Sequence, residues 1–296
     1  MKEYILSLKD VGMNDVDKVG GKNASLGEMI KHLDEAGVLV PGGFATTAEA
    51  FRDFLECDNL GDNINNRLDS LDVSDIGELV VVGKEIRQSI LDAKFSDEFL
   101  EQIKVAFSLM ERAYSGNEFS VAVRSSATAE DLPTASFAGQ QETYLNVRGI
   151  TDVLRRIKDV FASLFNDRAI SYRVHNGFAH RDVALSAGIQ RMIRSDKGAS
   201  GVMFTLDTES GFREAVFITA SYGLGEMVVQ GAVNPDEFYV YKHAITQGRK
   251  GILRRNLGSK LIQMTYASDG LGKEEVITSD VSIAERARFC IDDSDV

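Results

Sequence analysis

The hydrophobic pattern of the first 180 residues is mainly that of amphipathic helices. Apolar residues recur every three or four positions in five stretches, a spacing that places them on one helix face. They predict helices near 20–37, 46–55, 74–92, 96–114 and 151–176. Thr46, with Glu49 three residues on, has the spacing of an N-terminal cap. A short strand is expected at 4–8 and an edge segment with a turn at 38–44, and the polar stretch 59–70 is expected to lie mostly at the surface.

The pattern changes to strands after about residue 182. Apolar and polar residues alternate over 183–190, which is typical of a half-buried strand. Further strands are predicted at 202–205, 215–220 and 238–241, and a hairpin at 249–255 and 261–266 with Gly258 between its arms. A short helix is expected at 227–229, and Ser282 with Glu285 forms a capping box for a last helix through about Cys290. The chain is therefore predicted to be α+β, with one lobe at 1–181 and a second at 182–296.

Between these halves, residues 119–147 form two β-type runs around a loop of small polar residues. Ser125, Ser126 and Gly139 belong to this loop, whose N–H and hydroxyl groups are suited to holding an oxyanion. Arg124 lies where the first run ends, and a planar guanidinium can form bidentate hydrogen bonds with a phosphate. The pattern predicts a phosphate-binding hairpin, and the alternative is a polar hairpin with a surface arginine.

Composition excludes several classes of protein. The chain has 296 residues and a formal net charge of −12, which argues against nonspecific binding to nucleic acid or to an anionic membrane. Cys57 and Cys290 are the only cysteines, so two reduced thiols are expected rather than a metal site or a disulfide framework. The N-terminus has no apolar signal core and no run reaches membrane-spanning length, so a cytoplasmic location is predicted.

The remaining candidate chemistry is compatible with a nucleotide. Lys22 follows two glycines at a predicted helix N-terminus, where an anion is favoured, although a solvated lysine is the alternative. Gln190 and Met192 lie at the end of a predicted strand, where an adenine can stack and hydrogen-bond. Glu226, in a glycine turn, can approach a ribose hydroxyl or a magnesium-bound phosphate. No complete Walker-type motif occurs, so a nucleotide would be bound by residues from several elements.

Several blocks carry a resemblance to a known family. They are GGKNASLGEM at 20–29, VPGGFATT at 40–47, VRSSATAEDLP at 123–133, SFAGQQET at 136–143, GASGVMFTLDTESGF at 198–212, SYGLGE at 221–226 and GAVNPDEF at 231–238. Together they resemble the ATP-binding region of the phosphoenolpyruvate synthase and pyruvate phosphate dikinase family, which includes an antibiotic phosphotransferase. The last blocks are more similar to the synthase branch.

The resemblance implies an ATP-grasp fold with two lobes, ATP and Mg²⁺ as cofactors, and a set of site residues. ATP phosphates would be bound by Lys22 and by Arg124, the one catalytic residue assigned. The phosphate side would be lined by Gly139 and Thr143. The adenine would be bordered by Gln190 and Met192, and Glu226 would sit by the ribose or the metal.

The resemblance also implies a phosphotransferase reaction. In the family, ATP phosphorylates a histidine on a separate swivelling domain, and a pyruvate-binding barrel then accepts the phosphoryl group. The net reaction turns ATP, pyruvate and water into phosphoenolpyruvate, AMP and phosphate. The Thr-Cys-His phosphohistidine motif is absent from this sequence, and the family's late magnesium-binding segment would lie beyond Val296. The second lobe is therefore expected to be incomplete and the chain inactive alone. The alternatives are the ATP-binding domain of an antibiotic phosphotransferase and a module without nucleotide binding of its own.

Overall fold

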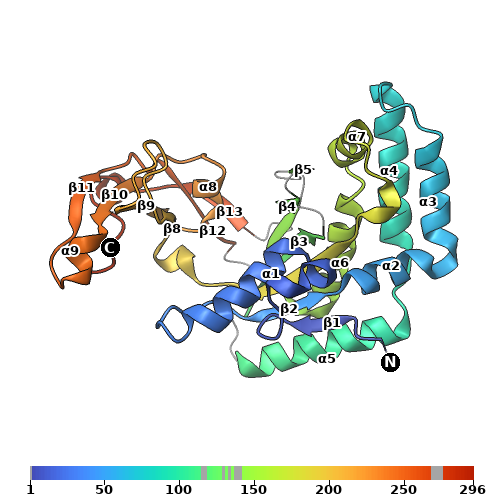
Figure 1. The fold of residues 1–296 in the computed structure, drawn as a ribbon, viewed down its shortest axis with the longest axis horizontal. Helices are drawn as coiled ribbons and strands as arrows, with labels where there is room; N and C mark the ends of the chain where they lie inside the picture. Colours follow the sequence, from blue (N-terminus) through green and yellow to red (C-terminus); the bar gives the residue numbers. More distant parts are fainter. Residues whose placement is uncertain (1, 115–118, 129–130, 133–134, 137–141, 268–275) are drawn as a thin grey trace. The chain divides into compact units, whose positions relative to one another are not determined.

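The computed structural model describes residues 2–114, 119–128, 131–132, 135–136, 142–267 and 276–296 (Figure 1). The chain divides into two compact units, Met1–Met192 and Ile193–Val296. Each unit has its own antiparallel sheet with helices, so the mixed helix and strand class predicted from the sequence is confirmed.

The first unit is built on a five-stranded sheet of order β1-β2-β7-β3-β6 in which every pairing is antiparallel. Its strands are β1 (Ile5–Ser7), β2 (Gly43–Thr46), β3 (Val121–Ala127), β6 (Thr143–Val147) and β7 (Leu185–Arg191). The short strands β4 (Asp131–Leu132) and β5 (Ala135–Ser136) pair with each other. The predicted pairing of the two runs around 119–147 is confirmed, since β3 pairs with β6. The sequence places a lobe boundary after residue 181, whereas the unit ends after Met192 because β7 is the middle strand of this sheet.

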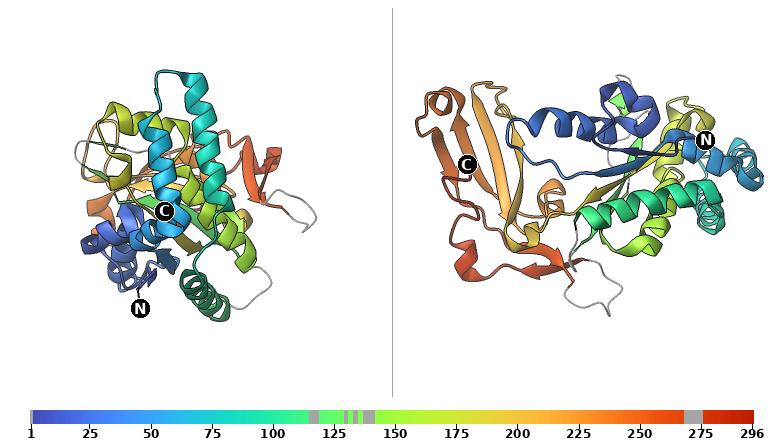
Figure 2. Two further views of the ribbon diagram at one scale, coloured as in Figure 1. Left: turned by 90° about the vertical axis from the view of Figure 1, so that its right-hand side faces the viewer. Right: turned by 90° about the horizontal axis from the view of Figure 1, so that it is seen from below.

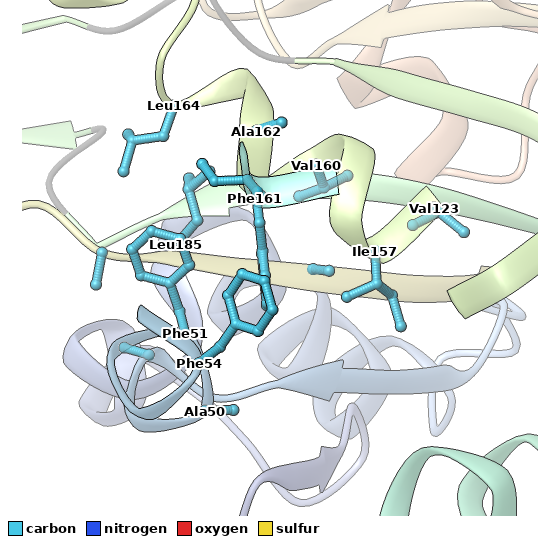
Figure 3. Close-up of a cluster of buried hydrophobic side chains, with 14 of the residues drawn as sticks. Ala50, Phe51, Phe54, Val123, Ile157, Val160, Phe161, Ala162, Leu164 and Leu185 are labelled. Atoms are coloured by element: carbon cyan, nitrogen blue, oxygen red, sulfur yellow. The ribbon is translucent and has the colours of Figure 1, made fainter. Parts of the chain in front are cut away.

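One face of the sheet packs on helices and forms the main hydrophobic core. The helices of the unit other than α1 are α2 (Ala48–Glu56), α3 (Leu60–Asp69), α4 (Ile76–Asp92), α5 (Asp97–Ala113), α6 (Gly149–Ser163) and α7 (Asp167–His175). Figure 2 shows α3 and α4 side by side. At the centre of the core Phe161 contacts Phe51, with ring centroids 5.0 Å apart, and Phe54 at 5.6 Å (Figure 3). Phe161 is fully buried, which contributes about 1.5–3 kcal/mol to stability.

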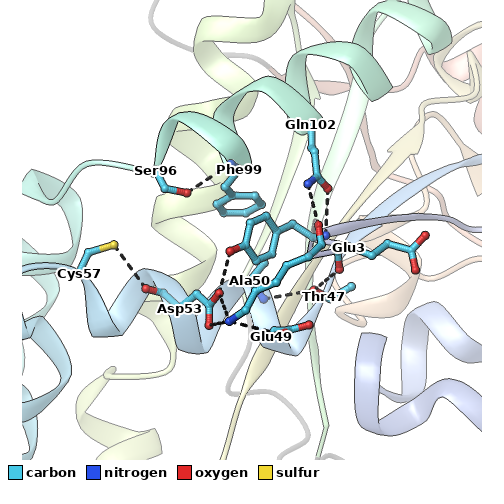
Figure 4. Close-up of polar contacts among 11 residues, drawn as sticks. Glu3, Thr47, Glu49, Ala50, Asp53, Cys57, Ser96, Phe99 and Gln102 are labelled. Atoms are coloured by element: carbon cyan, nitrogen blue, oxygen red, sulfur yellow. Dashed lines mark hydrogen bonds and ion pairs between the residues drawn. The ribbon is translucent and has the colours of Figure 1, made fainter.

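The amino-terminal segment is fastened to this layer by polar contacts. The Tyr4 hydroxyl donates to Asp53 Oδ2 at 2.7 Å, and the Gln102 side chain accepts from the Tyr4 N–H and donates to the Lys2 carbonyl (Figure 4). Thr47, not Thr46 as predicted, caps α2 by accepting from Ala50 N. Thr46 is used elsewhere, because its hydroxyl accepts the N–H of Ala187 in β7.

Other helix predictions are confirmed or corrected. The helix at 96–114 is confirmed, with Ser96 as its cap. The helix predicted at 151–176 is two helices, α6 and α7, because the chain turns at Leu164–Asn166 and buries Leu164 and Phe165. The polar stretch 59–70 contains α3, which packs Ile64 and Leu68 inward.

The opposite face of the sheet carries α1 (Val16–Leu33). A small hydrophobic cluster attaches the helix there and contains Leu8, Val11, Val19, Ala24 and Ala45. Gly27 lets the helix approach closely, since a Cβ at that position would lie 2.1 Å from the Val11 carbonyl oxygen. This face is the one that carries the candidate site.

The second unit contains a four-stranded sheet of order β11-β10-β9-β8 and a separate ribbon of β12 with β13. Its strands are β8 (Ala199–Phe204), β9 (Ala215–Tyr222), β10 (Asp236–Tyr241), β11 (Ile252–Asn256), β12 (Ile262–Tyr266) and β13 (Val276–Asp280). Its helices are α8 (Glu226–Val229), α9 (Lys242–Thr246) and α10 (Ile283–Arg286). The four 3₁₀ turns of the described chain are Met13–Asp15, Cys57–Asn59, His180–Asp182 and Ser195–Lys197.

The predicted hairpin of 249–255 with 261–266 is wrong. Strand β11 pairs with β10 and strand β12 pairs with β13. The reason is a buried anchor at the intended turn, where Lys260 Nζ donates to Asp236 Oδ1 at 2.5 Å and both side chains are fully buried. The capping box of Ser282 with Glu285 is confirmed, but α10 ends at Arg286 rather than near Cys290.

Candidate functional site

Arg124 is the central residue of β3 and lies on the sheet face that carries α1. On β3 it pairs with Gly188 of β7 on one side and with Thr143 of β6 on the other. Directly paired residues of an antiparallel sheet point to the same face, so Thr143 and Arg124 share that face. Gly188 has no side chain, and the amide of Asn23 lies over it on this face.

Gln190 shares this face, two residues beyond Gly188 on β7. Its Oε1 accepts a hydrogen bond of 3.1 Å from Arg124 Nη1, and its Nε2 donates to the carbonyl oxygen of Pro41 at 2.9 Å. The side chain is mostly buried, with 8% of the residue exposed. The structure therefore brings Gln190 and Arg124 into direct contact.

Lys22 belongs to a helical segment that begins at a kink in α1. Gly20 has φ +75° and ψ 163°, so the regular helix restarts after it and Lys22 falls in the new first turn. A Cβ on Gly20 would lie 2.3 Å from Ser126 Oγ. Only glycine fits this contact and this φ, so the helix start is held directly on β3, two residues along the strand from Arg124.

Asn23 fixes the same helix start to two strands. Its N–H donates to Ser126 Oγ at 3.2 Å, and its Nδ2 donates to Ser186 Oγ at 2.9 Å. Its Oδ1 lies over Gly188, where an added Cβ would be only 2.2 Å away. Asn23 is 2% exposed, so these bonds are made in the interior. Since Gly188 is the strand partner of Arg124, Asn23 sets Lys22 and Arg124 on one face of the sheet.

The other predicted residues are less closely connected. Met192 follows β7, is half-buried, and its N–H donates to the Ser120 carbonyl at 3.0 Å. Gly139 lies outside the described residues. Glu226 begins α8 in the second unit, where its Oε1 accepts from Gln230 Nε2 at 2.7 Å. Lys22, Arg124, Thr143, Gln190 and Met192 all belong to the first unit.

Two cationic side chains and the N-terminus of a helix on one face are suited to an anion. The first N–H groups of a helix and its dipole favour negative charge, and a guanidinium adds donors in a planar fork. The described residues of this unit thus provide the chemistry of a phosphate-binding site.

The sequence analysis did not identify Asn23, Ser186 or Gly188 as residues that hold the site together, and it placed Ser125 and Ser126 in a loop, although both are buried in β3. Asn23, Ser126 and Ser186 are buried polar side chains, and Gly20 and Gly188 are contact glycines. A polar asparagine on the inward side of α1 was an available signal, because a buried amide needs partners. Its partners were not readable, since Ser126 and Ser186 lie 103 and 163 residues away.

This face suits a phosphate, and comparison with known families identifies a nucleotide-binding domain. Residues 16–296 match the family described as pyruvate phosphate dikinase, AMP/ATP-binding domain. The chain belongs to this family.

Curated relatives are similar across the whole chain. Phosphoenolpyruvate synthase of Pseudomonas aeruginosa (strain UCBPP-PA14) is 60% identical over 296 residues, and the alignment covers 100% of this chain and 37% of the relative. The Escherichia coli (strain K12) protein of that name is 55% identical over 99% of the chain, again covering 37% of the relative. A probable phosphoenolpyruvate synthase of Methanocaldococcus jannaschii is 40% identical over 93% of the chain and 22% of its own length. The chain thus spans between about a fifth and little more than a third of the length of these relatives. No helix in the described ranges is long and apolar enough to cross a membrane.

Proposed function

We propose that this chain binds ATP on the sheet face of Arg124, as the ATP-binding part of a phosphoenolpyruvate synthase. One observation carries the proposal: Asn23 attaches the helix start bearing Lys22 to Ser126 and Ser186, on the face and beside the strand position of Arg124. Two cations held on one rigid face suit a polyphosphate. The family description, AMP/ATP-binding domain, supports ATP as the nucleotide. The names of the relatives support the phosphoenolpyruvate synthase reaction.

The finer assignments belong to the same proposal. The fold would be an ATP-grasp whose two lobes correspond to Met1–Met192 and Ile193–Val296. Lys22, Arg124, Gly139 and Thr143 would serve the phosphates, with Met192 by the adenine and Glu226 by the ribose. Gln190 lies at the same site.

Magnesium fits as part of the nucleotide rather than as a resident ion. Among the described residues, no group of three or more His, Cys, Asp and Glu side chains could hold a metal ion. Glu226 supplies one carboxylate, which already accepts a hydrogen bond from Gln230. Mg²⁺ is commonly held by substrate phosphates with one or two carboxylates, so the ion would arrive as MgATP.

The proposed reaction is phosphoryl transfer from ATP to a histidine on a domain outside this chain, followed by transfer to pyruvate. Such transfer depends mainly on positioning and charge stabilisation, which are the properties of a rigid face with Lys22 and Arg124. A chain without the accepting histidine domain would bind ATP and leave pyruvate unconverted. An antibiotic phosphotransferase with the same front end is the second candidate, and identities of 55% and 60% to synthases favour the first.

Calorimetric titration with MgATP tests the proposal. Wild type should bind saturably, and Arg124→Ala should weaken binding about 10- to 100-fold, since hydrogen bonds to charged groups contribute about 1.5–3 kcal/mol. Arg52→Ala is the matched control, because Arg52 is exposed on α2, which packs on the opposite face of the sheet. Absence of saturable binding by wild type would refute ATP binding by this chain. Equal losses in both variants would refute the location of the site.

A further inference from the structure

Both ends of the Gln190 side-chain amide form hydrogen bonds. Its nitrogen donates to the Pro41 carbonyl at 2.9 Å and its oxygen accepts from Arg124 Nη1 at 3.1 Å. We propose that Gln190 is a positioning residue that holds the Arg124 guanidinium for the nucleotide's phosphates, and that it affects binding through Arg124. This inference rests on the proposed function and deepens it.

The orientation of the amide follows from its partners. A carbonyl oxygen such as that of Pro41 can only accept a hydrogen bond, so the NH₂ end must face it. The oxygen is then left for Arg124, whose guanidinium can only donate. Both contacts would be lost if the amide were reversed, so the pair of neighbours selects one arrangement.

The anchor at Pro41 is itself rigid. Gly42 O accepts the N–H of Arg191 at 3.0 Å, and Gly43 pairs directly with Gln190. A Cβ on Gly43 would lie 2.0 Å from the Ile189 carbonyl oxygen, so the segment after Pro41 packs against β7 without space for a side chain. Proline adds a fixed φ to this segment. The Pro41 carbonyl therefore holds Gln190 from a backbone that cannot easily move.

Gly188, the direct strand partner of Arg124, has no side chain with which to contact it. Gln190 is the diagonal neighbour across β3 and β7, close enough for a long side chain to reach. An arginine side chain has many rotamers, and holding it before binding reduces the conformational entropy that is lost when a phosphate is bound. The contact thus converts a long side chain into a preorganised donor.

A role through Arg124 differs measurably from a role at the base. If Gln190 acts on the guanidinium, its removal should matter only while Arg124 is present. If it reads the adenine, its removal should weaken binding to the same extent with or without Arg124. A double-mutant cycle separates these cases.

The experiment measures MgATP affinity of the full chain for wild type, Gln190→Leu, Arg124→Ala and the double variant. We expect Gln190→Leu to weaken binding about 5- to 10-fold, the usual worth of a hydrogen bond, and to cause less than a twofold further loss when Arg124 is already alanine. Gln102→Leu is the matched control, because Gln102 also bridges two chain segments by both ends of its amide, remote from this face. It should bind MgATP as wild type does.

A readout without ligand completes the test. Nitrogen-15 spectra of the free protein should show an ordered Arg124 guanidinium signal, identified by its loss in Arg124→Ala, and this signal should become mobile in Gln190→Leu but not in Gln102→Leu. Two results would overturn this inference: unchanged MgATP affinity in Gln190→Leu, or an equal loss of affinity on adding Gln190→Leu to Arg124→Ala. The proposed function would still stand if Arg124→Ala alone weakens binding. No MgATP binding by wild type would overturn the inference together with the proposed function.

Discussion

Arg173 Nε donates a 2.9 Å hydrogen bond to Nδ1 of His180. The imidazole must accept at Nδ1, so its proton lies on Nε2 while the ring is neutral. Arg173 is fully buried, and this burial lowers its pKa to about 10, so the guanidinium remains charged at neutral pH. Burial, together with the charge of Arg173, lowers the pKa of His180 to about 4.

This pair predicts an acid-sensitive first unit. An unfolded histidine binds a proton near pH 6.5, whereas folded His180 binds one only near pH 4. The contribution of neutral His180 to the free energy of unfolding is fully present above pH 6.5 and is lost as the pH falls toward 4. The free energy of unfolding falls by at most about 1.4 kcal/mol per pH unit. His180→Gln should flatten the pH dependence of urea unfolding between pH 7 and about 5, followed by circular dichroism. Exposed His175→Gln is the control, and an unchanged slope in His180→Gln would contradict the prediction.

The contact of Asn23 with Gly188 predicts a non-additive pair of substitutions. A methyl group on Gly188 would meet all three amide atoms of Asn23, the nearest at 2.2 Å, so Gly188→Ala should destabilise by about 1–3 kcal/mol. Asn23→Ala should cost about 1–3 kcal/mol through its lost bond to Ser186. Because Asn23→Ala removes the clashing amide, Gly188→Ala should cost less in that background, as measured by urea unfolding. Strictly additive losses would show that the two residues do not meet.

The buried pair of Lys260 and Asp236 predicts a localised loss of structure in the second unit. Asp236 also accepts from the N–H groups of Gly258 and Cys290, each at 2.8 Å. Lys260→Met leaves a buried carboxylate without its cation, which costs about 3–5 kcal/mol. Hydrogen exchange should therefore accelerate in β10 and around residue 290, while β3 and β7 keep their protection. Exposed Lys250→Met should change neither region, and full protection of β10 in Lys260→Met would refute the prediction.

The same carboxylate predicts an unreactive thiol. Burial, reinforced by the hydrogen bond to Asp236, raises the pKa of Cys290 to about 12. Since the thiolate is the reactive form, Cys290 should be alkylated by iodoacetamide at pH 8 at least about 100-fold more slowly than an unperturbed thiol. The rate should be measured in a Cys57→Ser background, with urea-unfolded protein as the reference. Rapid alkylation of the folded protein would contradict the predicted burial.

Local signals in the sequence predicted local structure well. Ser282 caps its helix as expected, because the cap is made with Glu285, three positions away. Thr46 failed as a cap because its hydroxyl is engaged by Ala187, 141 residues further along the chain. The predicted hairpin around Gly258 failed for a similar reason, since Asp236 draws that turn inward.

The candidate site shows the same difference between local signals and contacts made by residues distant in sequence. Residue type and motif led to Lys22, Arg124 and Gln190, which the structure places in one unit on a shared framework. The framework itself, made by Asn23 with Ser126 and Ser186, depends on contacts between strands distant in sequence. Sequence periodicity carries no information about such contacts.

The central place of β7 has a consequence for how the protein is made. β7 pairs with β2 on one side and with β3 on the other, so Gln190 meets Gly43 and Ala122. During translation, β2 and β3 leave the ribosome long before their common partner exists. The first sheet can close only after about residue 191 has emerged, and sheets that depend on such distant pairings form slowly. A pause in synthesis before that point would leave two strands with unpaired edges, a state in which a nascent chain is prone to aggregate or to recruit a chaperone.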